Sequence, residues 1–114
     1  MPINQIAYLE LPSIDIATLK QFYAEIFGWT FQDYGPDYAA VEGAGLDGGF
    51  NADPSHKTRT PLAIIETNEI EAMEQKIRDA GGTITLPIFA YPGGRRFHFL
   101  DPQGNELAVM QVSH

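Results

Sequence analysis

The pattern of apolar and polar residues near the amino terminus predicts a strand followed by a helix. Residues 5–11 alternate in character like a β-strand, and enough of them are apolar that we expect both faces to be buried. Asp15 stands where the N-cap of a helix belongs, and apolar residues recur at helical spacing up to Phe27. Gly28 then supplies the left-handed residue that commonly follows a helix. The sequence therefore predicts a helix with one apolar stripe.

The same order of elements recurs in the second half. After a polar stretch at 52–60, we expect an apolar strand at 62–66 and a second helix that ends at Gly81-Gly82. Asn68 and Glu71 have the spacing of a capping box at the start of this helix. Short strands complete each half, at 29–34, 38–42 and 46–51 in the first and at 83–86, 95–100 and 106–112 in the second.

A constant shift relates the two halves. The step of 54 positions (69 − 15) that carries Asp15 to Glu69 also carries Tyr8 to Leu62. With 114 residues and 44% hydrophobic content, the chain is long enough for one core. We therefore expect a single domain, 1–114, built from two βαβββ modules over about 1–52 and about 60–114.

Two modules of this size would each leave one face of a sheet uncovered. Pairing would bury these faces and stabilise both modules. The expected fold is therefore α+β, with two paired βαβββ modules that form a curved mixed sheet around a concave cleft.

Composition narrows the classes of partner. The formal charge of −8 argues against nucleic acid and anionic membranes, and it would favour a cationic ligand. The chain has no cysteine, which excludes disulfides, a thiolate nucleophile and cysteine-bound zinc. It also shows no signal-peptide pattern and no apolar run long enough to span a membrane, so we expect a cytoplasmic protein.

Short motifs spread over nearly the whole chain resemble those of one protein family. They are Phe22-Tyr23, Phe27-Gly28-Trp29, Ala80-Gly81-Gly82 and the run from Asp101 to Glu106. Together they are similar to the vicinal oxygen chelate superfamily, which includes glyoxalases, bleomycin-resistance proteins and extradiol dioxygenases. The pairs Gly48-Gly49 and Leu86-Pro87 resemble a branch of small proteins related to lactoylglutathione lyase.

The resemblance also implies where metal ligands would stand. In metal-dependent members, each module contributes a His from its first strand and a Glu from its last strand. The equivalent positions here are Tyr8, Leu62 and Ala108, which are not normal ligands. The last strand of the first module offers only Asp47 and Asn51. We therefore expect no metal site of the usual kind and no cofactor.

Glu10 is the candidate catalytic residue. By strand parity it shares a face with Tyr8, so we expect it to point into the cleft. A carboxylate there could act as a general base, bind a cationic ligand or help hold a non-standard metal. The alternative is a carboxylate at the rim, hydrogen-bonded to Arg or Tyr. Glu66 has a comparable place in the second half, but it lies nearer the strand end and is expected to be solvated.

Three histidines offer imidazole chemistry. His98 stands between Phe97 and Phe99 and must face away from both. If the phenylalanines pack under a helix, His98 faces the cleft as a ligand or general acid; if they line the cleft, His98 is structural. His56, in the polar stretch, and the terminal His114 are weak candidates.

The run Gly93-Gly94-Arg95-Arg96 is interpreted as a hairpin rather than a phosphate-binding loop. It lacks a following Lys-Ser/Thr and a helix start. One of the arginines could form a bidentate bond to a substrate carboxylate or to Glu10.

These observations predict one ligand site and leave alternatives for its use. We expect metal-independent binding of a small organic molecule, which could be cationic, in a homodimeric protein that resembles the bleomycin-resistance type. Enzymatic activity is left open; the alternative is a metal-dependent lyase or isomerase similar to lactoylglutathione lyase, with non-standard ligands. A module that binds a protein partner is a third possibility. The residues expected to line the cleft are Tyr8, Glu10, Leu62, Ile64, His98, Glu106, Ala108 and Met110.

Overall fold

The computed structural model describes residues 3–55 and 58–113. These residues form two compact units. We call Tyr8–Leu62 the first unit; the second unit contains the residues up to Ala7 together with those from Ala63 onward. His56 and His114 lie outside the described residues.

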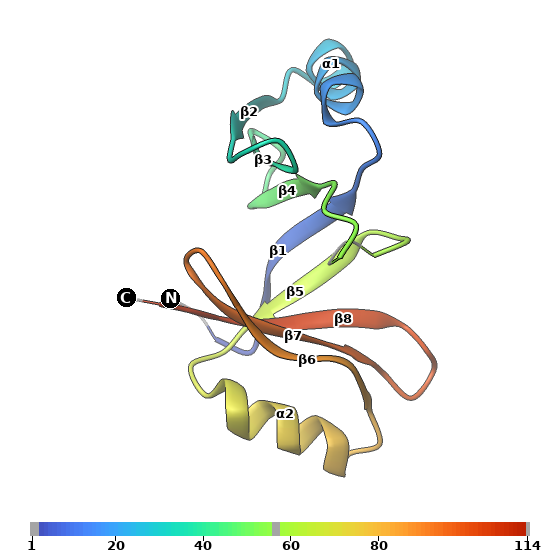
Figure 1. Ribbon diagram of the computed structural model, residues 1–114, viewed down its shortest axis with the longest axis vertical. Helices are drawn as coiled ribbons and strands as arrows, with labels where there is room; N and C mark the ends of the chain where they lie inside the picture. The colour runs from blue at the N-terminus through green and yellow to red at the C-terminus, as the bar shows by residue number, and fades with distance from the viewer. Residues whose placement is uncertain (1–2, 56–57, 114) are drawn as a thin grey trace. The chain divides into compact units, whose positions relative to one another are not determined.

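The first unit contains one helix and a four-stranded arrangement (Figure 1). Its strands lie in the order β2-β3-β4-β1. β1 pairs with β4 in parallel, whereas β2–β3 and β3–β4 are antiparallel. The elements are β1 (Gln5–Pro12, with its first three residues in the second unit), α1 (Ile16–Phe27), β2 (Thr30–Asp33), β3 (Tyr38–Glu42) and β4 (Gly48–Asn51).

The second unit repeats this order of elements. Its strands lie in the order β5-β8-β7-β6, with β5 and β8 parallel and the other pairs antiparallel. The prediction of an α+β fold made of two βαβββ modules is confirmed, while the concave cleft stays a prediction. The elements are β5 (Leu62–Glu66), α2 (Ile70–Asp79), β6 (Thr83–Tyr91), β7 (Gly94–Leu100) and β8 (Glu106–Val112).

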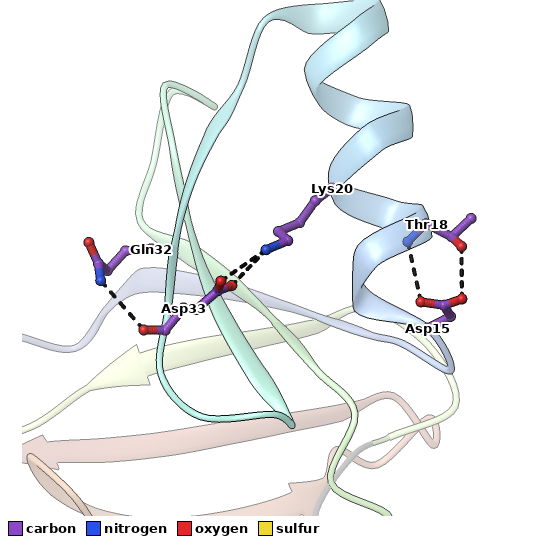
Figure 2. A network of polar contacts seen from close by, with 5 residues as sticks. All are labelled: Asp15, Thr18, Lys20, Gln32 and Asp33. Atoms are coloured by element: carbon purple, nitrogen blue, oxygen red, sulfur yellow. Dashed lines mark hydrogen bonds and ion pairs between the residues drawn. The ribbon is translucent and has the colours of Figure 1, made fainter.

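Both ends of α1 have the predicted caps. The Asp15 carboxylate accepts hydrogen bonds from the backbone N–H of Thr18 at 3.3 Å and from its hydroxyl at 2.9 Å (Figure 2). Gly28 is left-handed, with φ of 76°, and its N–H donates to the carbonyl of Ala24. Lys20 forms an ion pair with Asp33 at 2.8 Å, which links α1 to β2 (Figure 2).

The apolar stripe of α1 is only partly covered. Tyr23 stacks on Trp29 with ring centroids 4.8 Å apart and also contacts Phe50 at 5.6 Å. No residue of α1, all of which the structure describes, is fully buried. Phe22, Ile26 and Phe27 are between 53% and 60% exposed.

The core of the second unit lies between α2 and one face of its sheet (Figure 1). Ile70 of α2 packs with Phe97, Phe99 and Val109, which are all buried. Partly buried apolar side chains surround this cluster and extend it along the helix: Ile65, Met73, Ile77, Ile84, Ile88 and Leu107.

The predicted capping box of the second helix is wrong. Glu69 is the N-cap, and its side chain makes no capping hydrogen bond. Instead, the N–H of Ile70 donates to the side-chain carbonyl of Gln111 at 3.0 Å, and the N–H of Glu69 donates to the Thr67 hydroxyl at 3.2 Å. The donors at this helix start are therefore satisfied partly from β8.

Two strand predictions also need correction. β6 does not stop before Pro87 but continues to Tyr91, because an edge strand tolerates proline. Its register with β7 shifts between Ile84 and Leu86 and again between Leu86 and Phe89. The prediction that both faces of β1 are buried is wrong at the start of the strand, where Ile6 is 63% exposed.

The turn from β7 to β8 is organised by Asp101. Its carboxylate accepts hydrogen bonds at 2.9 Å from the backbone N–H of Gln103, from the backbone N–H of Asn105 and from the Asn105 amide. These bonds lower the pKa of Asp101, that from the Asn105 side chain most. The Asp-Pro-x-Gly-Asn motif is thus explained as a turn that closes on itself.

Within the described part of the chain, no helix is both long enough and apolar enough to cross a membrane.

Candidate functional site

In the first unit, Tyr8 and Glu10 lie on the sheet face opposite α1. Phe50, which contacts Tyr23 of α1, is the cross-strand neighbour of Leu11. Because neighbouring residues of a strand point to opposite faces, Glu10 points away from the helix. The predicted parity of the first strand is therefore confirmed.

A chain of hydrogen bonds connects four side chains on this face. Tyr38 Oη donates to Glu10 Oε2 at 3.0 Å, and the Oη atoms of Tyr8 and Tyr38 are 2.6 Å apart. Asn51 Nδ2 donates to the other carboxylate oxygen, Glu10 Oε1, at 3.1 Å. We call Tyr8, Tyr38, Glu10 and Asn51 the Glu10 network.

The Glu10 network is buried at its centre. Glu10 is 3% exposed and Asn51 is 4% exposed, whereas Tyr8 and Tyr38 are partly buried. Burial raises the pKa of Tyr38 far above its ordinary value, and the charge of Glu10 raises it further. Tyr38 therefore stays a neutral hydroxyl at any physiological pH, and it can donate to the carboxylate.

Gly49 makes room for this arrangement. A Cβ atom on Gly49 would lie 2.3 Å from the Tyr38 hydroxyl oxygen and 2.6 Å from two ring carbons. Glycine inside a strand commonly marks such a close approach. Of the Gly48-Gly49 pair, Gly49 is thus explained by the close approach of Tyr38.

In the second unit, the structure shows which face of the sheet His98 is on. Phe97 and Phe99 pack beneath α2, so His98 points to the opposite face of the sheet. There it pairs across the strands with Ala108, which in turn pairs with Ile64. His98 is 2% exposed, and its Nδ1 lies 3.4 Å from Glu106 Oε2.

Further charged side chains share this face of the second unit. Arg96 is 8% exposed and lies over the rings of Phe89 and Tyr91, at 5.6 and 5.8 Å from their centroids. Glu66 is 6% exposed, which corrects the expectation that it is solvated. Arg95 points to the helix side instead, where it forms an ion pair with Glu71 of α2.

The structure thus places the predicted residues in two groups. Tyr8 and Glu10 meet in the first unit, where Leu62 is also buried. Other predicted residues lie on the face of the second unit that is turned away from α2. Ile64, Ala108 and His98 form one cross-strand row there, and Met110 lies next to this row on β8. Glu106 approaches His98. A single cleft lined by both groups stays a prediction.

Sequence reasoning missed the roles of Tyr38 and Asn51. These two residues are cross-strand partners on β3 and β4, and both reach Glu10. The available signal was Gly49, since a glycine inside a strand indicates that a neighbouring group approaches the backbone.

The side chains present do not fit the metal centre that the family implies. The Tyr8 hydroxyl is engaged with Tyr38, while Leu62 and Ala108 carry no donor atoms. Among the described residues, no three His, Asp or Glu side chains come together as metal ligands would.

A small hollow lies on the other face of the first unit's sheet. Leu9, Leu11, Val41 and Trp29 line it, with a volume of about 70 Å³. That volume is well below the roughly 300 Å³ at which ligand pockets begin. It is separate from the Glu10 network, because Leu9 and Leu11 alternate with Glu10 along β1.

The sequence matches the family model of the Glyoxalase/Bleomycin resistance protein/Dioxygenase superfamily over residues 5–109. The chain belongs to this superfamily. An anthracycline biosynthesis protein, DauV, from Streptomyces sp. (strain C5) is 27% identical in an alignment 129 residues long, which covers 90% of this chain and 45% of that protein. The chain therefore spans less than half the length of this relative.

Solved structures support the same fold. A protein described as NAD-dependent benzaldehyde dehydrogenase from Legionella pneumophila has a TM-score of 0.75 at 18% identity, covering 93% of this chain and 98% of that one. A glyoxalase/bleomycin resistance protein/dioxygenase superfamily member from Vibrio splendidus 12B01 has a TM-score of 0.69 at 17% identity, covering 91% and 96%. At these identities the likeness concerns the fold alone.

Proposed function

We propose that this protein binds a small organic molecule at the Glu10 network without the usual metal of its superfamily. The proposal rests on the Glu10 carboxylate, which is only 3% exposed and lies on a sheet face that α1 does not cover. Buried carboxylates are costly unless they are paired, and they gather at functional sites. Asn51 and Tyr38 both donate hydrogen bonds to the Glu10 carboxylate.

The negative charge of the Glu10 carboxylate favours a ligand that carries an amine. A cationic ligand would supply the opposite charge to Glu10, and the net charge of −8 would attract it from solution. Homodimerisation, a cytoplasmic location and the relation to lactoylglutathione lyases remain parts of this proposal. A metal-dependent lyase is the less favoured function because the donor set does not fit.

Ligand screening by thermal shift tests the proposal. We expect aromatic amines to stabilise the protein more than neutral molecules of the same shape. Glu10→Gln should weaken their binding by about 1.5 to 3 kcal/mol, the range of a charge-assisted hydrogen bond. Glu25→Gln removes an exposed carboxylate of α1 and serves as the matched control.

Two outcomes would contradict the proposal. Equal loss of affinity in both variants would mean that only long-range charge matters. Near-stoichiometric Ni, Zn, Fe or Mn in elemental analysis of the purified protein would restore the metal-dependent alternative.

A further inference from the structure

The hollow on the α1 side of the first unit's sheet arises at a glycine. Val41, Gly48 and Leu9 are neighbours across β3, β4 and β1, and they lie on the same face as Phe50, which contacts α1. Gly48 leaves a gap between the two larger side chains. A side chain at this position cannot fill the gap without strain, because its Cβ would lie 2.6 Å from the carbonyl oxygen of Leu9. We call this space, which Gly48 and its neighbours line, the Gly48 hollow.

Helix α1 does not close the Gly48 hollow. Its Tyr23 ring contacts Trp29 and Phe50 instead, at centroid distances of 4.8 and 5.6 Å. Although the structure describes all of α1, none of the residues that line the hollow comes from this helix. Trp29 and the loop between β3 and β4 complete the lining, and Leu46 of this loop is 51% exposed. The hollow therefore has an exposed side by which a molecule can enter.

The size and lining of the Gly48 hollow limit what it can hold. Its volume is about 70 Å³, and the side chains of Leu9, Leu11, Val41 and Trp29 that line it are aliphatic or aromatic. An apolar cavity of roughly 150 Å³ binds benzene or xenon, so about half that volume takes a smaller apolar group. Filling such a space restores dispersion contacts that the lining side chains otherwise lack.

We propose that the Gly48 hollow is a binding site of its own, which takes an aliphatic group of about three to four carbons from a small molecule. The polar end of this molecule lies at the exposed side, next to Leu46. The hollow is on the opposite sheet face from Glu10, because Leu9 and Leu11 alternate with Glu10 along β1. The inference is therefore independent of ligand binding at the Glu10 network.

A series of primary alcohols from ethanol to hexanol tests this site. Binding is measured by NMR titration at the backbone amides of Val41 and Gly48 and at the Trp29 indole. We expect the affinity to rise about fourfold with each added methylene up to butanol, the worth of one buried methylene. Longer alcohols should gain little, because their further carbons remain in solvent. Adsorption to exposed apolar surface would instead strengthen steadily up to hexanol.

Two variants change the volume of the hollow in opposite directions. Ala44→Leu adds carbon to the lining and should weaken butanol binding about tenfold or more, the loss of two or more buried methylenes. Val41→Ala enlarges the hollow and should move the chain-length limit beyond butanol. Ala24→Leu adds the same side chain at an exposed position of α1 and should leave the alcohol series unchanged.

The possible results decide for or against this site. A steady rise in affinity through hexanol overturns the proposal, as does the absence of any shift of these signals with butanol. Butanol binding that Ala44→Leu leaves intact overturns it as well. Glu10→Gln should not alter the alcohol series, and a loss of butanol binding in that variant would mean that the alcohols bind at the Glu10 network instead. Should Ala44→Leu not fold, the chain-length limit and its shift in Val41→Ala still decide the question.

Discussion

The position of the Tyr38 ring requires a residue without a side chain at position 49. The Tyr38 ring lies across Gly49 so closely that a methyl group there would overlap its hydroxyl and two ring carbons. Gly48 has a different neighbour, because a Cβ on it would lie 2.6 Å from the backbone carbonyl oxygen of Leu9. The two glycines therefore respond differently to substitution.

We expect Gly49→Ala to lower the free energy of unfolding by about 1 to 3 kcal/mol, the usual cost of overpacking. Adding Tyr38→Ala should restore part of this loss, because the overlapping ring is removed. Gly48→Ala is the control, and its loss should not be recovered by Tyr38→Ala, since the obstacle there is backbone. Urea denaturation of the single and double variants measures both effects; strict additivity at Gly49 would contradict the contact.

Asp101 makes the stability of the folded protein depend on pH at low pH. Its pKa in the folded protein lies below the ordinary value of 3.8, because the Asn105 amide and nearby backbone N–H groups donate to the carboxylate. Stability from this group is present above pH 3.8 and is lost as pH falls through the lower, folded pKa. Asp101→Asn should flatten the decline in melting temperature between about pH 4 and 2, and an unchanged pH profile would show that the turn contributes nothing.

Some of the candidate site could be predicted from single residues and some could not. Side chains along a strand alternate between its two faces, which is a local property. The face on which Glu10 lies could therefore be predicted from its separation of two residues from Tyr8. The contacts of Glu10 with Tyr38 and Asn51 join residues 28 and 41 positions away, through a cross-strand register that local patterns do not determine.

The two helices begin in different ways. Asp15 caps α1 with its own carboxylate, whereas the side chain of Glu69 makes no capping bond to α2. The start of α2 is held instead by Gln111 from β8, a residue 41 positions away. Sequence alone predicted the first cap because all of its atoms come from one turn of chain, and it failed for the second because the partner is distant.

This difference predicts unequal effects of the same substitution. Asp15→Ala should destabilise the protein by about 1 kcal/mol, the typical value for a lost N-cap. Glu69→Ala should change stability by less than about 0.5 kcal/mol, as do most exposed substitutions without a special role. Thermal or urea unfolding of the pair checks the contrast, and a larger loss for Glu69→Ala would refute it.

At the scale of the whole molecule, α1 leaves apolar side chains in contact with solvent. Phe22, Ile26 and Phe27 are each more than half exposed in the isolated chain. Contiguous exposed apolar groups commonly mark an interaction surface.

We expect the protein to be a homodimer at micromolar concentration, with this helix at the interface. Ile26→Glu should shift the protein toward the monomer in sedimentation velocity, because burial of a new carboxylate is costly. Gln21→Glu introduces the same charge at an exposed polar position of α1 and should leave the assembly unchanged. A monomeric unaltered protein would contradict the prediction.

The division of β1 between the two units affects the order in which the chain can fold. The start of β1 belongs with the second unit, where the N–H of Asn4 donates to the carbonyl of Glu66 at 2.7 Å. In that unit β5 pairs with β8, which is the last strand of the chain. During synthesis, residues 3–7 are made before the residues from Ala63 onward, with which they form the second unit. The first residues of β1 can therefore take their place in that unit only after those later residues have been made.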